Sequence, residues 1–153
     1  MAVADINDDG MDDIIAGAHR ASAGEPARGA SGAAYIFNGE HNLPDRLSVV
    51  NGDESVAILG SAGATLGYPV ASGDFDGDGV QDFAMGAQLE ATEDVQGSGA
   101  IYVFFGGGPL KSTIDLAEDK ADVRVAGRET SEFLPSSLSA ADLDGDGRSE
   151  ILA

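Results

Sequence analysis

Three short acidic segments of this chain place carboxylates at alternating positions around a glycine, a spacing suited to holding a metal ion. They begin at Asp5, Asp74 and Asp142 and read DINDDGMDD, DFDGDGVQD and DLDGDGRSE. Calcium takes about six to eight oxygen ligands, and carboxylates spaced along a tight turn can converge on one point. The spacing therefore predicts calcium as the cofactor, with up to three Ca²⁺ ions per chain.

Each acidic loop offers the same five expected ligands, namely the side chains at positions 1, 3, 5 and 9 and the backbone carbonyl at position 7. Position 6 is a glycine, which tolerates the positive φ of a sharp turn. The expected ligands are Asp5, Asn7, Asp9, Met11 and Asp13 in the first loop, Asp74, Asp76, Asp78, Val80 and Asp82 in the second, and Asp142, Asp144, Asp146, Arg148 and Glu150 in the third.

The loops have two other interpretations. An EF-hand needs a bidentate Glu at position 12 and a helix on each side, but position 12 holds Ala16, Met85 or Ala153 and the sequence that follows is short and β-like. The loops could instead be acidic β-turns without metal, because Asp and Gly are common turn residues. Three copies at a constant spacing favour the metal sites.

The chain repeats itself with a period of about 68 residues. Residues 13–18 match residues 82–87, and residues 32–39 match residues 99–106. Further candidate strands cover residues 56–60 and 123–127, and then residues 68–75 and 136–143, which lead into the next acidic loop. Each period thus holds about four strands, as a propeller blade does.

Residues 100–105 are apolar at every position instead of alternating, so both faces of their sheet are expected to be covered. The predicted fold class is therefore all-β, with β-propeller blades of about four antiparallel strands. The chain would be a partial propeller over residues 1–153, with two full repeats, partial ends and no second domain. A single β-sandwich core is the alternative.

Composition excludes several classes of partner. The formal net charge is −19, from 27 Asp and Glu against 8 Lys and Arg, so nucleic acid and anionic membrane surfaces are not expected to bind. No apolar run is long enough for membrane insertion, and no signal peptide is present, so any export signal is expected outside these residues. The chain has no Cys and therefore no disulfide bonds, so a secreted domain would need another stabilising element, such as a bound metal.

No catalytic residue is expected. The two histidines, His19 and His41, have no serine or cysteine pattern beside them and are interpreted as surface residues. The glycine-rich residues 106–109 lack the spacing of a phosphate loop and are interpreted as a turn. The metal sites already explain the carboxylates at metal-binding spacing, and nothing in the sequence marks a further acidic pair of the kind a glycosidase uses.

The loop pattern DxDxDGxxD, followed by an apolar strand and Gly-Ala and then by a Tyr-Val-Phe strand, resembles the FG-GAP repeat of integrin-α-type β-propellers. The resemblance covers nearly the whole chain. Departures include His19 and Gln88 where that family usually has proline, and a Phe-Gly segment that reads Leu66-Gly67 in one copy and Phe133-Leu134 in the next. Asn7 and Glu150 also replace Asp.

The resemblance implies an extracellular propeller, secreted or on the cell surface, whose calcium loops join neighbouring strands of a blade. It implies a non-catalytic binding or cell-adhesion module with a protein or glycan ligand, and flanking propeller blades in the same or a neighbouring chain as further partners. Two alternatives stay open. The blades could be the scaffold or accessory part of a secreted enzyme acting on polysaccharide or lipid, or a short-chain lectin that assembles into a closed ring.

Overall fold

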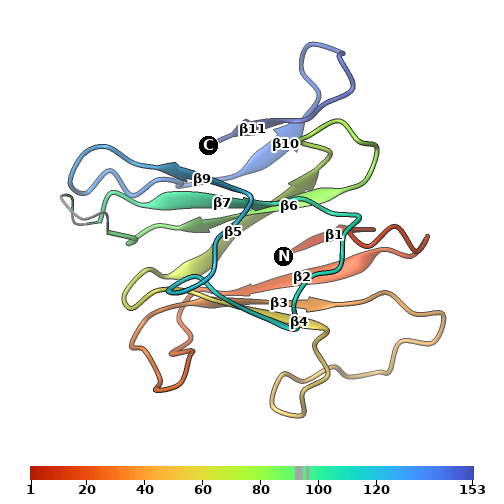
Figure 1. Ribbon diagram of the computed structural model, residues 1–153, viewed down its shortest axis with the longest axis horizontal. Coiled ribbons are helices and arrows are strands. Elements are labelled where there is room, and N and C mark those ends of the chain that lie inside the picture. The colour runs from red at the N-terminus through yellow and green to blue at the C-terminus, as the bar shows by residue number, and fades with distance from the viewer. Residues whose placement is uncertain (92–94, 96) are drawn as a thin grey trace.

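The computed structural model describes residues 1–91, 95 and 97–153, which form two β-sheets and a β-hairpin (Figure 1). The described residues include no helix, which confirms the all-β fold class. In particular, none of the described residues belongs to a helix long and apolar enough to cross a membrane.

The first sheet is built from four consecutive strands and one that comes from much later in the sequence. Its strand order is β1-β2-β3-β4-β8. Strands β1 to β4 pair antiparallel, whereas β8 runs parallel to β4. The bounds are β1 (Ala2–Ala4), β2 (Asp13–Ala18), β3 (Ala33–Phe37), β4 (Val56–Leu59) and β8 (Thr113–Asp115).

The second sheet repeats this antiparallel arrangement, in the order β5-β6-β7-β9, and the hairpin β10-β11 follows it. The bounds are β5 (Leu66–Gly73), β6 (Asp82–Ala87), β7 (Ala100–Phe104), β9 (Val123–Ala126), β10 (Ser139–Ala141) and β11 (Glu150–Leu152). The prediction of about four antiparallel strands per blade is therefore confirmed. The strand that precedes each acidic loop opens the next sheet, so a sequence period is offset by one strand from a blade.

The main apolar core lies between the two sheets. It joins Ile15, Ile36 and Ile58 of the first sheet to Phe83 and Met85 of the second, all of them fully buried. Phe83 stacks on Phe104, with the ring centroids 5.0 Å apart. A smaller cluster around Ala84, Ile101 and Val103 packs the other face of the second sheet toward the hairpin. Every residue of β6 and β7 is buried, which is what stacked blades require.

Glycines let the two blades approach at their inner strands. A Cβ built on Gly17 of β2 would lie 1.7 Å from the carbonyl oxygen of Gly67 in β5, a separation that no side chain can have. The matching residue of the second blade, Gly86, has the Tyr68 carbonyl oxygen and the Pro135 ring at under 3 Å from the same position. The glycine of each Gly-Ala pair thus leaves room for neighbouring atoms that a side chain would displace.

Two features differ from the sequence prediction. Strand β8 was not foreseen, because residues 105–122 carry no clear strand pattern and its partner belongs to the other blade. The counterpart of Leu66 is Leu134 and not Phe133: both leucines donate their N–H to a serine carbonyl, Ser31 or Ser98. The residues before them, Thr65 and Phe133, both adopt positive φ, 58° and 55°.

Candidate functional site

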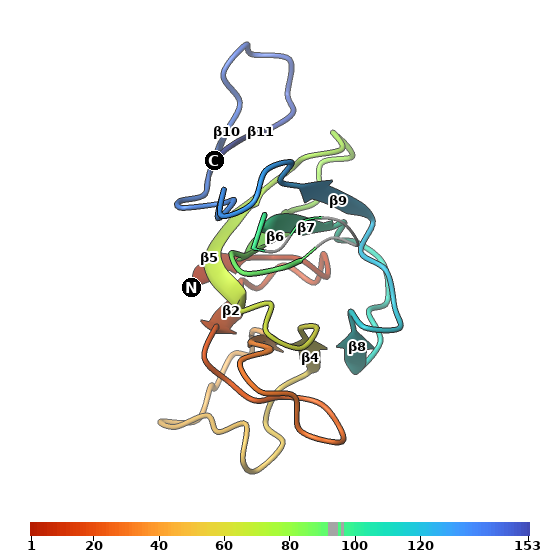
Figure 2. The ribbon, with the colours of Figure 1, turned by 90° about the vertical axis from the view of Figure 1, so that its left-hand side faces the viewer.

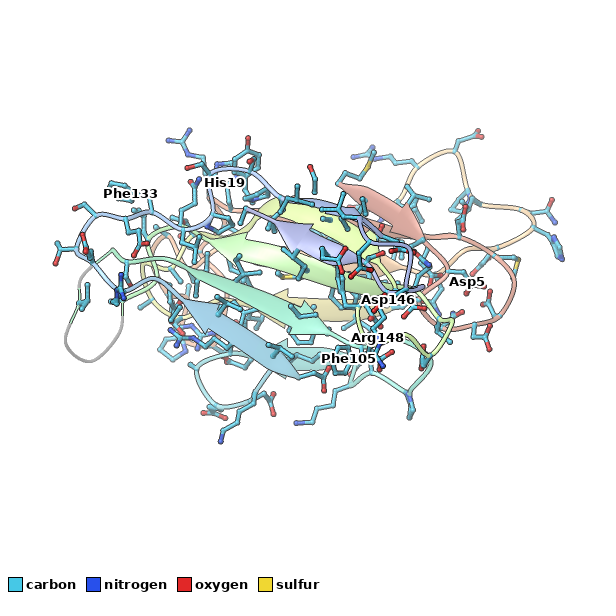
Figure 3. All side chains as sticks on the ribbon, turned by 90° about the horizontal axis from the view of Figure 1, so that it is seen from above. Asp5, His19, Phe105, Phe133, Asp146 and Arg148 are labelled. Atoms are coloured by element: carbon cyan, nitrogen blue, oxygen red, sulfur yellow. The ribbon has the colours of Figure 1, made fainter. Side chains whose placement is uncertain are left out.

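The three acidic loops all lie at the same end of the molecule, since each connects an inner strand to its neighbour: β1 to β2, β5 to β6 and β10 to β11. Figure 3 shows Asp5 and Asp146 toward this end, while His19 and Phe133 lie at the opposite end. The fold therefore separates an acidic, loop-bearing end from an end with exposed aromatic and histidine side chains.

The second loop is shaped by its own carboxylates. Asp74 accepts hydrogen bonds from the N–H groups of Gly77 (2.7 Å) and Gly79 (2.9 Å). Asp76 accepts from Asp78 N–H at 3.0 Å, and Asp78 from Val80 N–H at 2.8 Å. Each of these acids folds back onto the backbone two to five residues ahead, so the loop curls around its carboxylates.

The other two loops have the same construction. In the third, Asp142 accepts from Gly145 and Gly147, Asp144 from Asp146, and Asp146 from Arg148. In the first, Asp5 accepts from Asp9 and Gly10, Asn7 from Asp9, and Asp9 from Met11. The Asn7 amide also donates to the Asp9 carboxylate at 3.0 Å, a bond that no aspartate at this position could make.

Two positions of each loop require a left-handed backbone. Position 6 is Gly10, Gly79 or Gly147, with φ of 87°, 91° and 94°, as the sequence predicts for the sharp turn. Position 4 also has positive φ: 80° in Gly77, 81° in Gly145 and 57° in Asp8. Aspartate is one of the few side chains that enter this region readily. The role of position 4 was not foreseen.

In the first and second loops, the acid at position 9 connects the loop to the rest of its blade. Asp82 is 1% exposed; its two carboxylate oxygens accept the N–H of Phe75 at 2.7 Å and of Gly106, just after β7, at 2.8 Å. Asp13 repeats this with Ile6 at 3.1 Å and Gly39 at 2.8 Å. Glu150 makes the bond within the loop alone, accepting from Leu143 at 2.8 Å. Burial raises the pKa of both Asp13 and Asp82, while the backbone hydrogen bonds oppose the rise.

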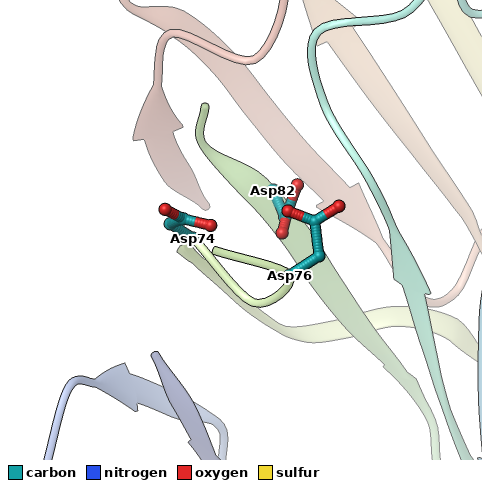
Figure 4. A group of neighbouring side chains, drawn as sticks. All are labelled: Asp74, Asp76 and Asp82. Atoms are coloured by element: carbon teal, nitrogen blue, oxygen red, sulfur yellow. The ribbon is translucent and has the colours of Figure 1, made fainter. Parts of the chain in front are cut away.

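The structure brings acidic side chains together in two of the loops. Asp74, Asp76 and Asp82 have carboxylate oxygens within 4.8 Å of one another (Figure 4), and so have Asp142, Asp144 and Asp146. Among the described residues these are the two such groups, so the first loop, with Asn7 at position 3, forms none. Asp78 and Glu150 lie outside the two groups. All three acids of the second group are exposed, whereas the first group includes a buried acid.

Neighbouring loops are also joined across the blades. Gly107 N–H donates to the carbonyl of Ile6 in the first loop at 2.9 Å, and Ser149 N–H of the third loop donates to the carbonyl of Asp74 at 2.6 Å. Position 106 requires glycine, because a Cβ there would lie 2.2 Å from the Gln81 carbonyl oxygen. The recurrence of Gly39 and Gly106 after matching strands was the available signal for this contact.

A second polar cluster lies on the outer part of the second blade, away from the loops. Glu90, Tyr102 and Arg124 line a cavity of about 320 Å³ together with Leu116, Asp119, Lys120 and Ala121. Arg124 Nε donates to the Tyr102 hydroxyl at 3.3 Å and its Nη2 lies 4.0 Å from the Glu90 carboxylate. Burial raises the pKa of Glu90, and the Tyr102 hydrogen bond and the Arg124 charge oppose the rise.

Replacing Glu90 with glutamine is expected to stabilise the chain at neutral pH. Since the pKa of Glu90 is higher in the folded chain than the usual 4.5, its favourable contribution is complete below that value and is lost as pH rises through the folded pKa. A glutamine carries no charge and avoids this loss. Urea unfolding at about pH 7 and about pH 4 should show a gain for the variant only at the higher pH. A variant less stable than wild type at neutral pH would mean that the Arg124 contact outweighs burial.

Comparison with known proteins adds to this geometry. The sequence model of the FG-GAP repeat matches residues 1–37 and 66–104, each of which includes one acidic loop and the two strands after it.

The chain is 32% identical to phosphatidylinositol-glycan-specific phospholipase D of Bos taurus over 99% of its own length and 18% of that protein. It is 30% identical to integrin alpha-PS5 of Drosophila melanogaster over 79% of its length and 11% of that protein. Integrin alpha-3 of Mus musculus is 32% identical over 68% of the chain and 9% of its own length. The chain thus spans less than a fifth of each of these curated relatives.

Proposed function

Because this chain is a member of the FG-GAP repeat family with blades of the integrin-α type, we propose that it is a calcium-stabilised, non-catalytic binding module. It serves as part of a secreted or cell-surface β-propeller and recognises a protein or a glycan, as an adhesion protein does. The observation that carries the proposal is the group formed by Asp74, Asp76 and the buried Asp82, whose carboxylate oxygens lie within 4.8 Å of one another.

Calcium fits this group by the chemistry of its donors. Three carboxylates so close together repel one another, and a divalent cation removes that repulsion while using oxygen ligands it prefers. The loops already hold their carboxylates with backbone hydrogen bonds, so little ordering is left for binding to impose. The further ligands of the second site are Asp78 and the Val80 carbonyl, and the first and third loops bind with the corresponding residues.

The metal has a structural role: it holds neighbouring strands together and does not contact the partner. Asp82 contacts both the loop and the end of β7, and Asp74 is bonded to the third loop through Ser149. Neutralising the second loop therefore stabilises two neighbouring blades at once. The partner binds elsewhere, and the exposed side chains of His19 and Phe133 at the opposite end offer a suitable surface. Exposed Tyr68 adds to it, since its ring centroid lies 5.4 Å from that of His19.

Differential scanning calorimetry with calcium and with a chelator tests this function. A ligand that binds only the folded state at about 100 times its Kd adds about 2.7 kcal/mol to the free energy of unfolding. We expect a clear rise in the melting temperature with Ca²⁺ and a smaller one with Mg²⁺, which demands a stricter octahedral geometry. An unchanged melting temperature would exclude the stabilising role.

A second candidate function is favoured by the match to phosphatidylinositol-glycan-specific phospholipase D, which extends over 99% of this chain. In that case the blades are a scaffold or accessory part of an enzyme that acts on a lipid or glycan substrate. They would still bind calcium and still carry no catalytic residue. A catalytic domain in the reading frame of the whole protein would favour this candidate, and adhesion modules would favour the first.

A further inference from the structure

Strand β8 shows that one blade can complete the sheet of another. It belongs by sequence to the β7–β9 connection of the second blade, yet it pairs in parallel with β4, the outer strand of the first (Figure 2). Its register places Thr113, Ile114 and Asp115 opposite Ala57, Ile58 and Leu59. Ala57 N–H donates to Ser112 and Leu116 N–H to Leu59, both at 2.9 Å. The first sheet thereby gains a fifth strand.

Side chains hold this added strand in place. Ile114 is 6% exposed and belongs to the apolar core between the blades, together with Ile58. Asp115 forms an ion pair with Arg28 of the first blade at 2.8 Å. The Arg28 guanidinium keeps the pKa of Asp115 below its usual value although partial burial acts the other way. Three residues are thus enough to pair with an outer strand when an apolar side chain enters the core.

Strand β9 is the counterpart of β4 in the second blade, but its outer edge has no partner strand among the described residues. The Gly127 N–H donates to the Gly99 carbonyl, and the Gly60 N–H donates to the matching Gly32 carbonyl. Strands β9 and β4 therefore pair with β7 and β3 in the same register. Arg124 and Ala126 therefore direct their backbone N–H and C=O groups to the open edge, as Ala57 and Leu59 do toward β8. Val125, the counterpart of the buried Ile58, is 46% exposed.

The first blade also has a counterpart of β8, which pairs with no strand in the part of the chain that the structure describes. Its β3–β4 connection, residues 38–55, has the same length as the β7–β9 connection, residues 105–122. In each connection a hydrogen bond joins the first residue to the last. Asn38 N–H donates to the Ser55 hydroxyl, and Phe105 N–H donates to the Asp122 carboxylate. Ser48 N–H donates to Asp53 as Asp115 N–H donates to Asp119. Residues 46–48 therefore occupy the place of β8 but belong to no strand.

We propose that the open edge of β9 is an interaction surface for the corresponding connection of an adjoining FG-GAP blade, which adds one parallel strand there. The inference rests on the proposed function, in which flanking blades are partners of this chain. The occupant is a three-residue extended segment with an apolar middle residue that packs beside Val125, and without a cation opposite Arg124. Thr113, Ile114 and Asp115 have this chemistry.

The chain's own residues 46–48 make a poor occupant of that edge in a second copy. The register of β4 and β8 would place Arg46 directly opposite Arg124, and like charges across a strand pair are destabilising. The net charge of −19 adds repulsion between two copies. Replacing residues 46–48 with the sequence of β8 removes the first obstacle. It also changes the net charge from −19 to −21, so salt is needed to screen the repulsion between copies.

The test is a triple variant, Arg46→Thr with Leu47→Ile and Ser48→Asp, in Ca²⁺ and about 0.15 M salt, where the Debye length is about 8 Å. Sedimentation velocity over a concentration series should show association with a Kd at least about tenfold lower than for wild type, equivalent to about 1.4 kcal/mol. An Ala126→Pro change removes one N–H from the open edge and none from the β7 side. Adding it to the triple variant should abolish the association without unfolding the chain.

Register is tested by cross-linking, since the chain has no cysteine of its own. A Val125→Cys chain mixed with a chain that carries Arg46→Thr, Leu47→Cys and Ser48→Asp should form an intermolecular disulfide. Val50→Cys, which is 91% exposed but out of register, serves as the control and should not. A monomeric triple variant, or cross-linking that is equal for both positions, would overturn the proposed surface. Neither result would affect the calcium-dependent melting, so the two proposals can fail separately.

Discussion

Replacing Asp82 with alanine is expected to lower the free energy of unfolding of the calcium-loaded chain by about 3–5 kcal/mol. The substitution leaves the N–H groups of Phe75 and Gly106 without their acceptor, and each buried group left unpaired costs about 1–3 kcal/mol. It also removes an expected ligand of the second calcium site. In chelator the loss should be smaller, because the burial that raises the pKa of Asp82 makes its charge costly when no metal is bound. Urea unfolding in the two conditions measures both values.

Asp78→Ala is the matched control in the same loop. Asp78 is exposed, and the hydrogen bond that it accepts, from Val80 N–H at 2.8 Å, is local. In chelator its removal should cost less than about 1 kcal/mol, whereas with calcium it should weaken stability through lost metal affinity. Equal losses for both variants in chelator would contradict the role of Asp82 as a buried connection between the loop and β7.

Replacing Gly17 with alanine is expected to destabilise the chain by about 3 kcal/mol or more, near the upper end of overpacking effects. The new Cβ would lie 1.7 Å from the Gly67 carbonyl oxygen, a backbone atom that no side-chain rotation can move away. Strand β5 would have to shift from β2 and carry the packing of the two blades with it. Thermal unfolding measures the loss, and near-ultraviolet circular dichroism reports on the packing of the tyrosine and phenylalanine side chains.

Gly29→Ala is the control for this prediction. No heavy atom lies within 4 Å of its would-be Cβ, and its φ is not in the left-handed region. Its stability should change by no more than about 0.5 kcal/mol. A Gly17→Ala chain as stable as the Gly29→Ala chain would show that the inner strands of the two blades can separate freely at this point.

The loops and most strands could be predicted from the sequence because their determinants are local. The alternation of Asp, the turn glycines and the apolar strands after each loop repeat at a fixed period. The strand positions of β2, β6, β4 and β9 agree with prediction to within a residue or two. The continuous apolar run of β7 correctly indicated a sheet covered on both faces.

Features that depend on contacts between blades could not be predicted in this way. Strand β8 is three residues long, and only its parallel partner β4 makes Thr113–Asp115 a strand. The bond from Ser149 to Asp74 joins residues far apart in sequence. The positive φ of Asp8 is a different case: it is local to its loop, and the glycines at the same position of the other two loops, Gly77 and Gly145, were the signal for it in the sequence.

Isothermal titration calorimetry of the metal-free chain with Ca²⁺ tests the central claim most directly, because it counts the ions and measures their affinities. We expect saturable binding of up to three ions, the tightest in the second loop, where the buried Asp82 joins Asp74 and Asp76. An Asp76→Asn variant, which gives the second loop the amide that Asn7 supplies in the first, should weaken that tight site alone. Absence of saturable binding at millimolar calcium, or an unchanged isotherm in the variant, would contradict the account of these loops as calcium clasps.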